Sequence, residues 1–444
     1  MNTVYQNKYK LLYGNTLNSS KPTFKQSDQI QLIGNSGGNT LEFSISDEVI
    51  SQHSLFLGGT GTGKTNLMYH FVKQIKTHMS KEDVMIIFDT KGDFYTKFFD
   101  KNRDFVLGNS SKYINESIPW NIFREIVADG WDYGTIKQNT YEIIDSLLYE
   151  EFEHSKDIFF PTAVKEVIIS IILKLIKLSI EDEIFKKKNL YNDQLVDFLE
   201  HLTPQLLKEF LKNDSEFDSI INYFGDGSNN QSLGIMATLT NVVKRFFIGV
   251  FSDRGMFSIR HFIKNKNAST LFIEYDLSLG SSLLPVYRVL YDLALKECLG
   301  QENCKGNVYL FCDEFRLLPN LQHISDALNF ARSLGVKIFA GLQNVSQLYD
   351  LYGENKGNSL LGGFSSIYMF RSTDFLSRKY IKESQGENVG VDIYTGFNNN
   401  YIQEKRRGNT IEDWDILSLE LGECIVCLPT NPPFSFKASL FKGD

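Results

Sequence analysis

The 444-residue sequence predicts an α/β fold with a mostly parallel sheet plus an all-α insertion domain. Two observations lead to this prediction. Several apolar runs, such as Val-Met-Ile-Ile-Phe at 84–88, show no alternation of apolar and polar residues, which is typical of strands buried on both faces of a parallel sheet. These runs alternate with helical patterns on both sides of a long helical block, and such alternation implies βαβ units.

Composition narrows the classes of function. Hydrophobic residues make up 42% and aromatic residues 13% of the chain, so it can fill a large core and wholesale disorder is excluded. The net charge of −8 excludes a strongly basic protein that coats nucleic acid. It does not exclude DNA as a partner, because a basic pore or groove can lie inside an acidic whole.

The chain begins with a short β-rich lead-in, residues 1–50, in which strands are expected at 30–33 and 41–45. The first part of the core follows at 51–121. Turn-forming glycines separate its apolar runs from its helical patterns. They predict, in order, a strand at 54–57, a Gly-rich loop, a helix from 66 to about 78 and a strand at 84–88.

Residues 122–247 are dominated by long helical patterns and are predicted to form the all-α insertion. Helices are expected there at 140–148, 161–179, 193–199, 206–211 and 233–247, with loops at 186–188 and 225–230. The second part of the core, 248–444, returns to α/β alternation. Its predicted strands are 270–274, 308–312, 336–342, 366–370 and 423–428, and its predicted helices are 284–298 (from near Pro285), 323–334 and 375–385.

No stretch is expected to span a membrane, because charged residues interrupt the most apolar run, 164–180. Residues 1–21 lack the apolar core of a signal peptide, so a cytoplasmic location is expected. The five cysteines are too sparse for a disulfide framework. Cys424 and Cys427 lie in a predicted strand, where they would point to opposite faces, so buried structural roles are favoured over a metal site.

A phosphate-binding loop is the most specific motif. Eight consecutive residues satisfy G-x-x-x-x-G-K-[ST] between a predicted strand and a predicted helix: Gly58, Gly59, Thr60, Gly61, Thr62, Gly63, Lys64 and Thr65. Backbone N–H groups of such a loop surround a β-phosphate, the lysine neutralises the β- and γ-phosphates, and the threonine hydroxyl binds Mg²⁺. The alternative, a Gly-rich turn with an incidental Lys-Thr, is disfavoured by the flanking elements. ATP and Mg²⁺ are therefore the expected cofactors.

Two carboxylates end the apolar strand at 308–312. By the pattern of P-loop ATPases, Asp313 would hold Mg²⁺, and Glu314 would orient and polarise the attacking water as a catalytic residue. The alternative is an acidic pair at the surface, which the earlier phosphate loop makes less plausible.

Further motifs extend the match. They are Asp-Thr-Lys-Gly-Asp at 89–93, Asp-Glu-Phe with a later leucine at 313–318, Arg-Ser-Leu-Gly at 332–335 and a strand-final Gln343. Together with 370–374 and 421–426, this set resembles the FtsK/HerA superfamily of ring-forming DNA-pumping ATPases. Within it, residues 45–435 look most like the cytoplasmic motor of TraG/TraD-type conjugative coupling proteins. The family's membrane-spanning N-terminal region has no counterpart in the roughly fifty polar residues before the loop.

The resemblance implies a RecA-like P-loop NTPase core and roles for individual residues. Gln343 would contact the γ-phosphate or the water, and Arg332 would be an arginine finger that reaches a neighbouring subunit's nucleotide. Such an arginine can supply roughly 10³–10⁵ in rate. Arg254 is a second candidate for the finger. A surface salt bridge for Arg332 and an ordinary strand-end amide for Gln343 stay open as alternatives. Asp89 and Asp93 are either Mg²⁺-side groups or stabilise their loop.

The implied function is an ATP-driven DNA translocase that acts as a homo-oligomer, expected to be a hexamer. It would track the DNA backbone with little sequence preference. The loop candidates for DNA contact are 316–323 and 186–189, whereas the basic triplet 405–407 is expected in a solvated polar loop. A relaxase partner would indicate conjugation, and a nuclease or effector partner would indicate phage defence. The alternative function is a regulatory nucleotide-binding subunit without translocation, which Glu314 disfavours.

Overall fold

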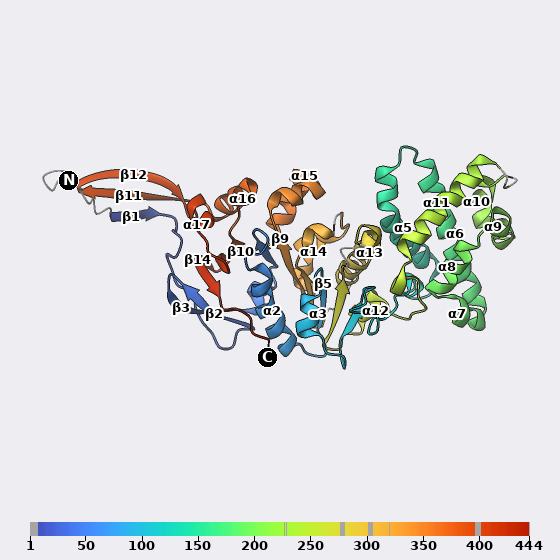
Figure 1. Cartoon of the computed structure of the whole chain (residues 1–444), viewed down its shortest axis with the longest axis horizontal. Coiled ribbons are helices and arrows are strands. Elements are labelled where there is room, and N and C mark those ends of the chain that lie inside the picture. Colours follow the sequence, from blue (N-terminus) through green and yellow to red (C-terminus); the bar gives the residue numbers. More distant parts are fainter. Residues whose placement is uncertain are drawn as a thin grey trace. The chain divides into compact units, whose positions relative to one another are not determined.

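The structure is a computed structural model that describes residues 8–225, 227, 229–275, 280–300, 305–318, 320–395 and 401–443 (Figure 1). The chain forms two compact units. Unit 1 comprises Met1–Met85, Asn303–Pro319 and Ile324–Asp444, and unit 2 comprises Ile86–Glu302 and Asn320–His323. Unit 1 is thus built from three separate segments of the chain, whereas unit 2 is almost continuous in sequence.

The centre of unit 1 is a set of parallel strands in the order β10-β4-β9-β8. Every residue of these four strands is buried, as the non-alternating apolar runs predicted. Antiparallel strands continue the sheet beyond β10 in the order β13-β14-β2-β3. The bounds are β2 Ile30–Ser36, β3 Asn39–Ile45, β4 Ser54–Leu57, β8 Val308–Cys312, β9 Val336–Leu342, β10 Ser366–Phe370, β13 Glu423–Leu428 and β14 Asn431–Ala438.

Helices connect the strands of unit 1. They are α1 Asp47–Ile50, α2 Lys64–His78, α14 Ile324–Phe330, α15 Val345–Gly362, α16 Phe375–Gln385 and α17 Asp413–Leu417. The helix predicted at 323–334 is only partly right, because the chain tightens into a 3₁₀ turn at Ala331–Leu334. Gly335 ends that turn with a φ of 76°, a left-handed conformation that glycine adopts without strain.

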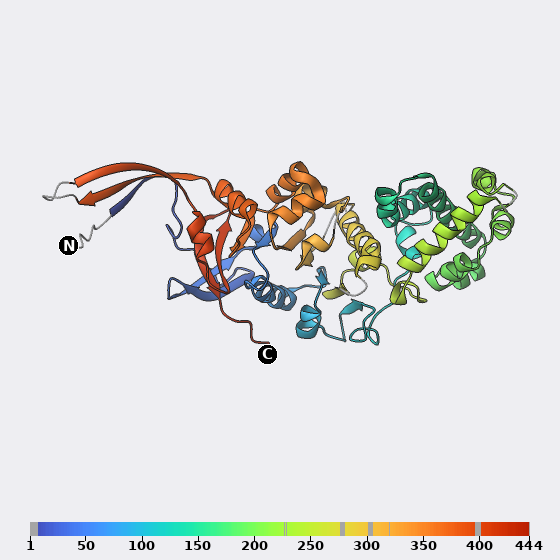
Figure 2. The same cartoon turned by 45° about the horizontal axis from the view of Figure 1, so that its top comes forward.

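A second, three-stranded antiparallel sheet was not predicted. It consists of β1 (Lys8–Tyr13), β11 (Glu387–Thr395) and β12 (Tyr401–Asn409), and it projects from the rest of unit 1 (Figures 1 and 2). The triplet Lys405–Arg407 lies in β12, so its assignment to a loop is wrong. The expectation failed because Ile402 is the one aliphatic residue of β12, and the short alternation of Val389, Val391 and Ile393 in β11 was not recognised as a strand.

Unit 2 begins with the end of β5 (Val84–Asp89), whose first two residues belong to unit 1, followed by α3 (Asp93–Phe98). Strand β6 (Phe105–Leu107) pairs in parallel with β7 (Ser269–Glu274). Two helices flank β7 in sequence, α12 (Ile259–Lys264) and α13 (Gly280–Leu299). Pro285 lies inside α13 and not at its start as predicted, because burial of the helix's apolar residues outweighs the one backbone hydrogen bond that proline forgoes.

The described residues between β6 and β7 form helices and connecting segments without a strand. The helices are α4 Ile122–Ile126, α5 Tyr133–His154, α6 Phe159–Glu181, α7 Glu183–Asn189, α8 Asn192–Glu200, α9 Pro204–Leu211, α10 Asp218–Tyr223 and α11 Asn230–Phe246. The loop predicted at 186–188 is wrong, since these lysines form the last turn of α7. Cations there interact favourably with the helix dipole, and Asp182 caps the other end.

The α/β prediction with a mostly parallel sheet and a block of helices is confirmed, whereas the domain boundaries stay a prediction. Among the described helices, none has both the length and the apolar character that a membrane crossing requires. Cys424 and Cys427 are buried, free thiols in β13.

Candidate nucleotide site

The Gly-rich loop connects β4 to α2 in unit 1, as predicted. Gly58 and Gly63 have φ values of 156° and 114°, a region that side chains disfavour. A Cβ atom at Gly58 would lie 2.5 Å from the Phe370 Cβ, and one at Gly63 would lie 2.8 Å from the Gly422 Cα. Conformation and space therefore both require glycine at these two positions.

Backbone hydrogen bonds from three other segments hold the loop. The Gly58 N–H donates to the Leu342 carbonyl at the end of β9 (3.1 Å), and the Gly59 N–H donates to the Arg371 carbonyl just after β10 (3.0 Å). The Gly422 N–H, just before β13, donates to the Thr62 carbonyl (2.9 Å). The sequence analysis used segments 370–374 and 421–426 only as part of the family resemblance. In the structure, Arg371 and Gly422 of these segments form backbone hydrogen bonds with the loop.

Lys64 is nearly buried, with 7% of its surface exposed. Its Nζ donates to the carbonyl oxygens of Gly58 (2.6 Å) and Gly59 (2.9 Å), on the loop itself. The first backbone N–H groups of α2, which begins at Lys64, lie beside the same loop. A helix N-terminus next to an ammonium group is a site for an anion such as phosphate.

Thr65 and Asp313 meet in space although 248 residues separate them. The Thr65 hydroxyl lies 3.1 Å from both carboxylate oxygens of Asp313. Mg²⁺ prefers oxygen ligands, and with nucleotides it needs only one or two from the protein. The pair therefore fits Mg²⁺ bound together with phosphate. Nowhere in the described part of the chain do three or more metal-binding His, Cys, Asp or Glu side chains cluster.

Glu314 and Gln343 also come together, at the ends of neighbouring strands β8 and β9. The Gln343 Nε2 donates to the Glu314 Oε2 at 2.7 Å. The other oxygen of Glu314 lies 3.3 Å from the Arg316 Nε. One hydrogen bond and one ion pair thus orient the carboxylate of a side chain that remains 18% exposed. Arg316 was not assigned to this site, because nothing in its sequence context marks it as a partner of Glu314.

The two arginine-finger candidates have different surroundings. Arg332 lies in the 3₁₀ turn after α14. Its side chain is 49% exposed and makes a loose ion pair, 3.7 Å, with the exposed Glu48. Arg254, in unit 2, lies 3.7 Å above the Tyr191 ring and donates to the Lys187 carbonyl (3.2 Å). It also contacts Asp193 at 3.5 Å. Arg254 is therefore engaged within its own subunit.

Asp89 is the last residue of β5, and Asp93 is the first residue of α3. The Asp89 carboxylate accepts hydrogen bonds from the backbone N–H groups of Tyr95 (2.8 Å) and Lys91 (3.4 Å). Burial raises the pKa of Asp89 to about 6, although these hydrogen bonds oppose the shift. Of the two roles left open for Asp89, these contacts support the one in which it stabilises its loop.

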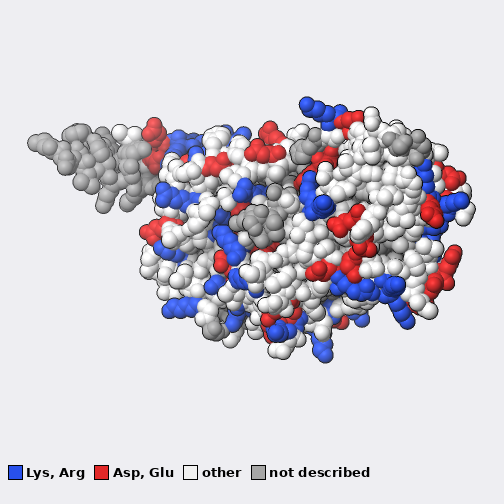
Figure 3. All heavy atoms as spheres, turned by 45° about the vertical axis from the view of Figure 1, so that its right-hand side comes forward, with Lys and Arg blue, Asp and Glu red and all other residues white. Residues whose placement is uncertain are grey.

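The predicted DNA-contact segments are spread over both units. Phe315–Leu317 forms a 3₁₀ turn in unit 1, whereas Asn320–His323 belongs to unit 2. There Asp292 accepts from the Gln322 N–H (2.9 Å), and the His323 Nε2 lies 3.2 Å from Glu142. Figure 3 shows basic and acidic side chains interleaved over the visible face, with uncharged areas between them. Any DNA contact on this face must therefore come from local groups of cations.

Known proteins share this sequence pattern and fold. A family model described as the type IV secretion-system coupling protein DNA-binding domain matches residues 40–401. The coupling protein TraD of Escherichia coli (strain K12) is 24% identical over 404 residues, which cover 85% of this chain and 51% of TraD. The chain thus spans about half the length of this curated relative. The match confirms the resemblance to conjugative coupling proteins.

Solved structures show the same fold. The unbound monoclinic form of the bacterial conjugative coupling protein TrwBdeltaN70 superimposes with a TM-score of 0.73 at 20% identity, covering 98% of this chain and 94% of that chain. Plasmid coupling protein TrwB in complex with ADP and Mg²⁺ gives a TM-score of 0.70 at 21% identity, covering 98% and 96%. VirB4 of Thermoanaerobacter pseudethanolicus gives 0.55 at 10% identity, covering 94% and 98%. These likenesses confirm the RecA-like core.

Proposed function

Because the chain belongs to the family described as the type IV secretion-system coupling protein DNA-binding domain, we propose that it is an ATP-driven motor that moves DNA. The observation that carries this proposal is the convergence of the phosphate loop, the Thr65–Asp313 pair and the Glu314–Gln343 pair within unit 1. TrwB, which has the same fold, has been solved with ADP and Mg²⁺ and with a non-hydrolysable ATP analogue, which supports ATP and Mg²⁺ as cofactors here.

In this proposal Lys64 exchanges the carbonyl oxygens of Gly58 and Gly59 for phosphate oxygens when ATP binds. Thr65 and Asp313 hold Mg²⁺, which when bound neutralises phosphate charge. Glu314 accepts a hydrogen bond from the attacking water and polarises it, since its carboxylate is oriented yet partly exposed. Gln343 keeps Glu314 in place and can sense the γ-phosphate through the same amide group.

We further propose that subunits form a ring, with a hexamer as the expected form. The exposed, loosely paired Arg332 is free to act on a neighbouring subunit's nucleotide, whereas Arg254 is engaged locally. The DNA would be held by its backbone with little sequence preference. The identity of a protein partner, whether a relaxase or a nuclease or other effector, stays a prediction that neighbouring open reading frames can test.

Glu314→Gln tests the proposal. The amide cannot accept a proton, so we expect at least a ~100-fold loss of steady-state ATP hydrolysis with nucleotide affinity retained. Glu383→Gln, an exposed carboxylate on α16, is the matched control and should hydrolyse ATP like the wild type. Unchanged hydrolysis in Glu314→Gln would contradict the role of Glu314.

A translocation assay then separates the motor from the alternative function. The wild type should displace streptavidin from biotinylated DNA in an ATP-dependent manner, and Glu314→Gln should not. ATP hydrolysis without displacement under any DNA geometry would favour a regulatory nucleotide-binding subunit.

A further inference from the structure

A cavity of about 300 Å³ lies in unit 2, outside the nucleotide site. Helix α4, helix α7 and helix α12 contribute to its walls together with the connecting segments. Its lining combines three aromatic side chains with three cations: Phe123, Trp131, Tyr191, Arg124, Lys186 and Lys187. We call this site the aromatic–cation cavity. Its volume is at the lower end of the range of small-ligand pockets, which suits a ligand of nucleotide size.

Each of two aromatic rings in the cavity is paired with a cation. The Lys186 Nζ lies 3.9 Å from the centroid of the Trp131 ring, and the Arg254 guanidinium lies 3.7 Å from that of Tyr191. Trp131 nevertheless keeps 39% of its surface exposed. Its large ring is therefore available for stacking next to a positive charge.

The cavity has an excess of positive charge. Glu183 is the one acidic residue among its described lining residues, and it is 3.4 Å from Lys186. Within the described residues, the Arg124 guanidinium contacts the Met256 sulfur at 3.8 Å and no carboxylate, and Lys187 has no ion pair. Burial, with Arg124 nearby, lowers the pKa of His261, so this lining residue is neutral at pH 7 and can donate or accept a hydrogen bond.

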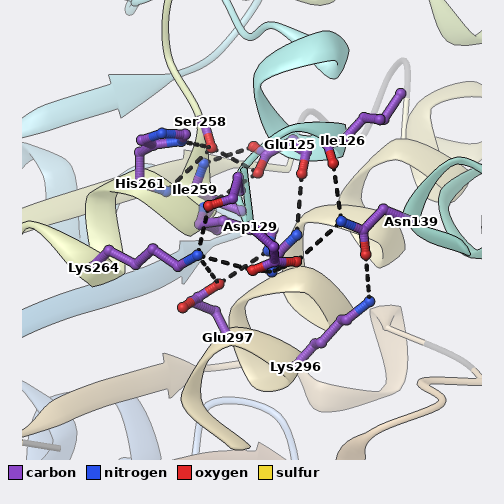
Figure 4. Close-up of polar contacts among 12 residues, drawn as sticks. Glu125, Ile126, Asp129, Asn139, Ser258, Ile259, His261, Lys264, Lys296 and Glu297 are labelled. Atoms are coloured by element: carbon purple, nitrogen blue, oxygen red, sulfur yellow. Dashed lines mark hydrogen bonds and ion pairs between the residues drawn. The ribbon is translucent and has the colours of Figure 1, made fainter. Parts of the chain in front are cut away.

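One wall of the cavity is held rigidly (Figure 4). The fully buried Glu125 of α4 accepts hydrogen bonds from the Ser258 hydroxyl (2.8 Å) and the Ile259 N–H (2.7 Å), which join α4 to the start of α12. On the same helix α12, Arg260 binds Asp129 at 2.6 Å and Glu297 of α13 at 3.0 Å. These buried charge-assisted bonds preorganise the α4 and α12 wall.

The wall formed by α7 is joined to the start of α4 by hydrogen bonds. Asn121, fully buried before α4, donates its two amide hydrogens to the Leu190 carbonyl (3.0 Å) and the Gly255 carbonyl (2.9 Å). Leu190 directly follows α7, which carries Lys186 and Lys187. Buried hydrogen bonds thus fix the backbone segments that form the cavity walls.

We propose that the aromatic–cation cavity binds one unstacked base of single-stranded DNA, together with its flanking phosphates. The base stacks on Trp131, and Arg124, Lys186 and Lys187 contact the phosphates. This inference rests on the proposed function, since it names where the motor holds its DNA. Single strands fit better than duplex, because a base reaches an aromatic side chain only when it is unstacked. Every base has a stacking face, so little sequence preference is expected.

Tryptophan fluorescence provides a direct test. The chain has three tryptophans, of which Trp120 is buried and Trp414 is exposed in unit 1. In full-length Trp414→Phe, Trp131 is the exposed tryptophan that remains. Titration with a 20-residue oligothymidylate should quench its fluorescence saturably. The same quenching in the double variant Trp131→Phe/Trp414→Phe, or no quenching in the single variant, would overturn the stacking role.

A matched lysine pair tests the phosphate contacts. Lys187 lines the cavity, whereas its exposed neighbour Lys188 on α7 does not. Lys187→Ala should weaken oligothymidylate binding about 5-fold and reduce the salt dependence, since one phosphate contact contributes a slope of about 0.7. Trp131→Ala should weaken binding about 10-fold, within the range for one stacked base. Lys188→Ala should change affinity less than about 2-fold, and an equal loss in Lys187→Ala and Lys188→Ala would contradict the assignment.

Two further outcomes have separate meanings. If the wild type hydrolyses ATP and binds DNA but Trp131→Ala and Lys187→Ala bind it equally well, the cavity assignment fails and the proposed function stands. If the wild type binds no DNA, the proposed function fails as well. Equal competition by polyglutamate of the same charge would identify the cavity as a protein-binding site and overturn the proposal. Circular dichroism of each variant shows that a loss of binding is not a loss of fold.

Discussion

The phosphate loop of unit 1 and the aromatic–cation cavity of unit 2 both gather positive charge, but they are built differently. The loop uses eight consecutive residues, backbone N–H groups and one nearly buried lysine that is hydrogen-bonded to two carbonyl oxygens. The cavity uses side chains from residues 121–191 and 256–261. Of its cations, Lys187 is exposed, and Arg124 and Lys186 are half-buried. Backbone donors fix one phosphate at one position, whereas long lysine side chains that stay at least partly exposed beside a stacking surface suit a strand that must slide.

The two regions also differ in what stabilises them. Around the loop, neighbouring strands supply backbone hydrogen bonds. Beside the cavity, a buried ionic network around Glu125 and Arg260 holds the helices. We therefore expect single substitutions to remove chemistry in unit 1 without unfolding it, and to reduce the stability of unit 2 without changing nucleotide affinity.

The largest effect is expected for Arg332→Ala. If Arg332 acts on a neighbour's nucleotide, hydrolysis should fall about 10³-fold or more while nucleotide binding persists. Mixing this variant with Lys64→Ala should partly restore turnover, since mixed interfaces combine an intact loop with an intact arginine. No restoration at any ratio, or an equal loss in Arg254→Ala, would show that the site in unit 1 is not completed by Arg332.

Gln343→Ala should have the next largest effect. Without the 2.7 Å hydrogen bond, Glu314 keeps only its ion pair with Arg316 for orientation, so kcat should fall about 10- to 100-fold with KM nearly unchanged. Steady-state kinetics measures both values, and the surface residue Gln385 provides the control Gln385→Ala. A change confined to KM would mean that Gln343 serves ground-state binding and not the orientation of Glu314.

Arg260→Met tests whether the buried ionic network stabilises unit 2. Removing the buried guanidinium takes away the close contacts of Asp129 and Glu297 and leaves them the partly exposed Lys264 as a cation, which should lower the free energy of unfolding by about 3 kcal/mol. Urea unfolding followed by circular dichroism measures this. Arg245→Met removes a more exposed arginine paired with Glu150 and Glu151, and it should cost about 1 kcal/mol or less. Equal costs would contradict the central role of the buried network.

The smallest effect concerns pH. Burial lowers the pKa of His53 to about 4. His53 directly precedes β4, at the end of that strand away from the phosphate loop, and its Nδ1 accepts a hydrogen bond from the Ile338 N–H of β9. The unfolded chain takes up a proton near pH 6.5 and the folded chain only near 4. Unit 1 should therefore lose up to about 3 kcal/mol as the pH falls through that window. Asp89 in unit 2, with its pKa raised to about 6, has the opposite sign and gains stability on acidification.

His53→Asn should remove the acid sensitivity of unit 1 while preserving its stability at pH 7. Asparagine keeps an acceptor near the Nδ1 position and tolerates the positive φ of 59°. Denaturant titrations at pH 7 and pH 4.5 measure the difference. An unchanged pH dependence in the variant would assign the effect to another group.

The sequence predicted the nucleotide site of unit 1 well and the aromatic–cation cavity of unit 2 not at all. The phosphate loop and the buried strands were predictable because each is contiguous and has a distinctive local pattern. Glu314 and Gln343 were named as site residues from the motif and the family resemblance. Their hydrogen bond to each other and the Arg316 contact were not predicted, since both depend on side-chain geometry. Helix α7 was missed because its lysines favoured a loop. The β1–β11–β12 sheet was missed because β12 is mostly polar and the short apolar alternation of β11 was not recognised. The cavity could not be predicted from the sequence, because its residues come from separate segments that only the fold brings together.

The discontinuity of unit 1 has a consequence for how the protein is made. A ribosome releases Thr65 early, but its partner Asp313 emerges 248 residues later, followed by β9, β10 and Gly422, which support the loop. Almost all of unit 2 emerges between them. We therefore expect the helices of unit 2 to fold during translation, while the first strands of unit 1 still lack their partner strands. Exposed strand edges in that intermediate favour aggregation. The nucleotide site would be the last part to form, so a nascent chain could bind ATP only when synthesis is nearly complete.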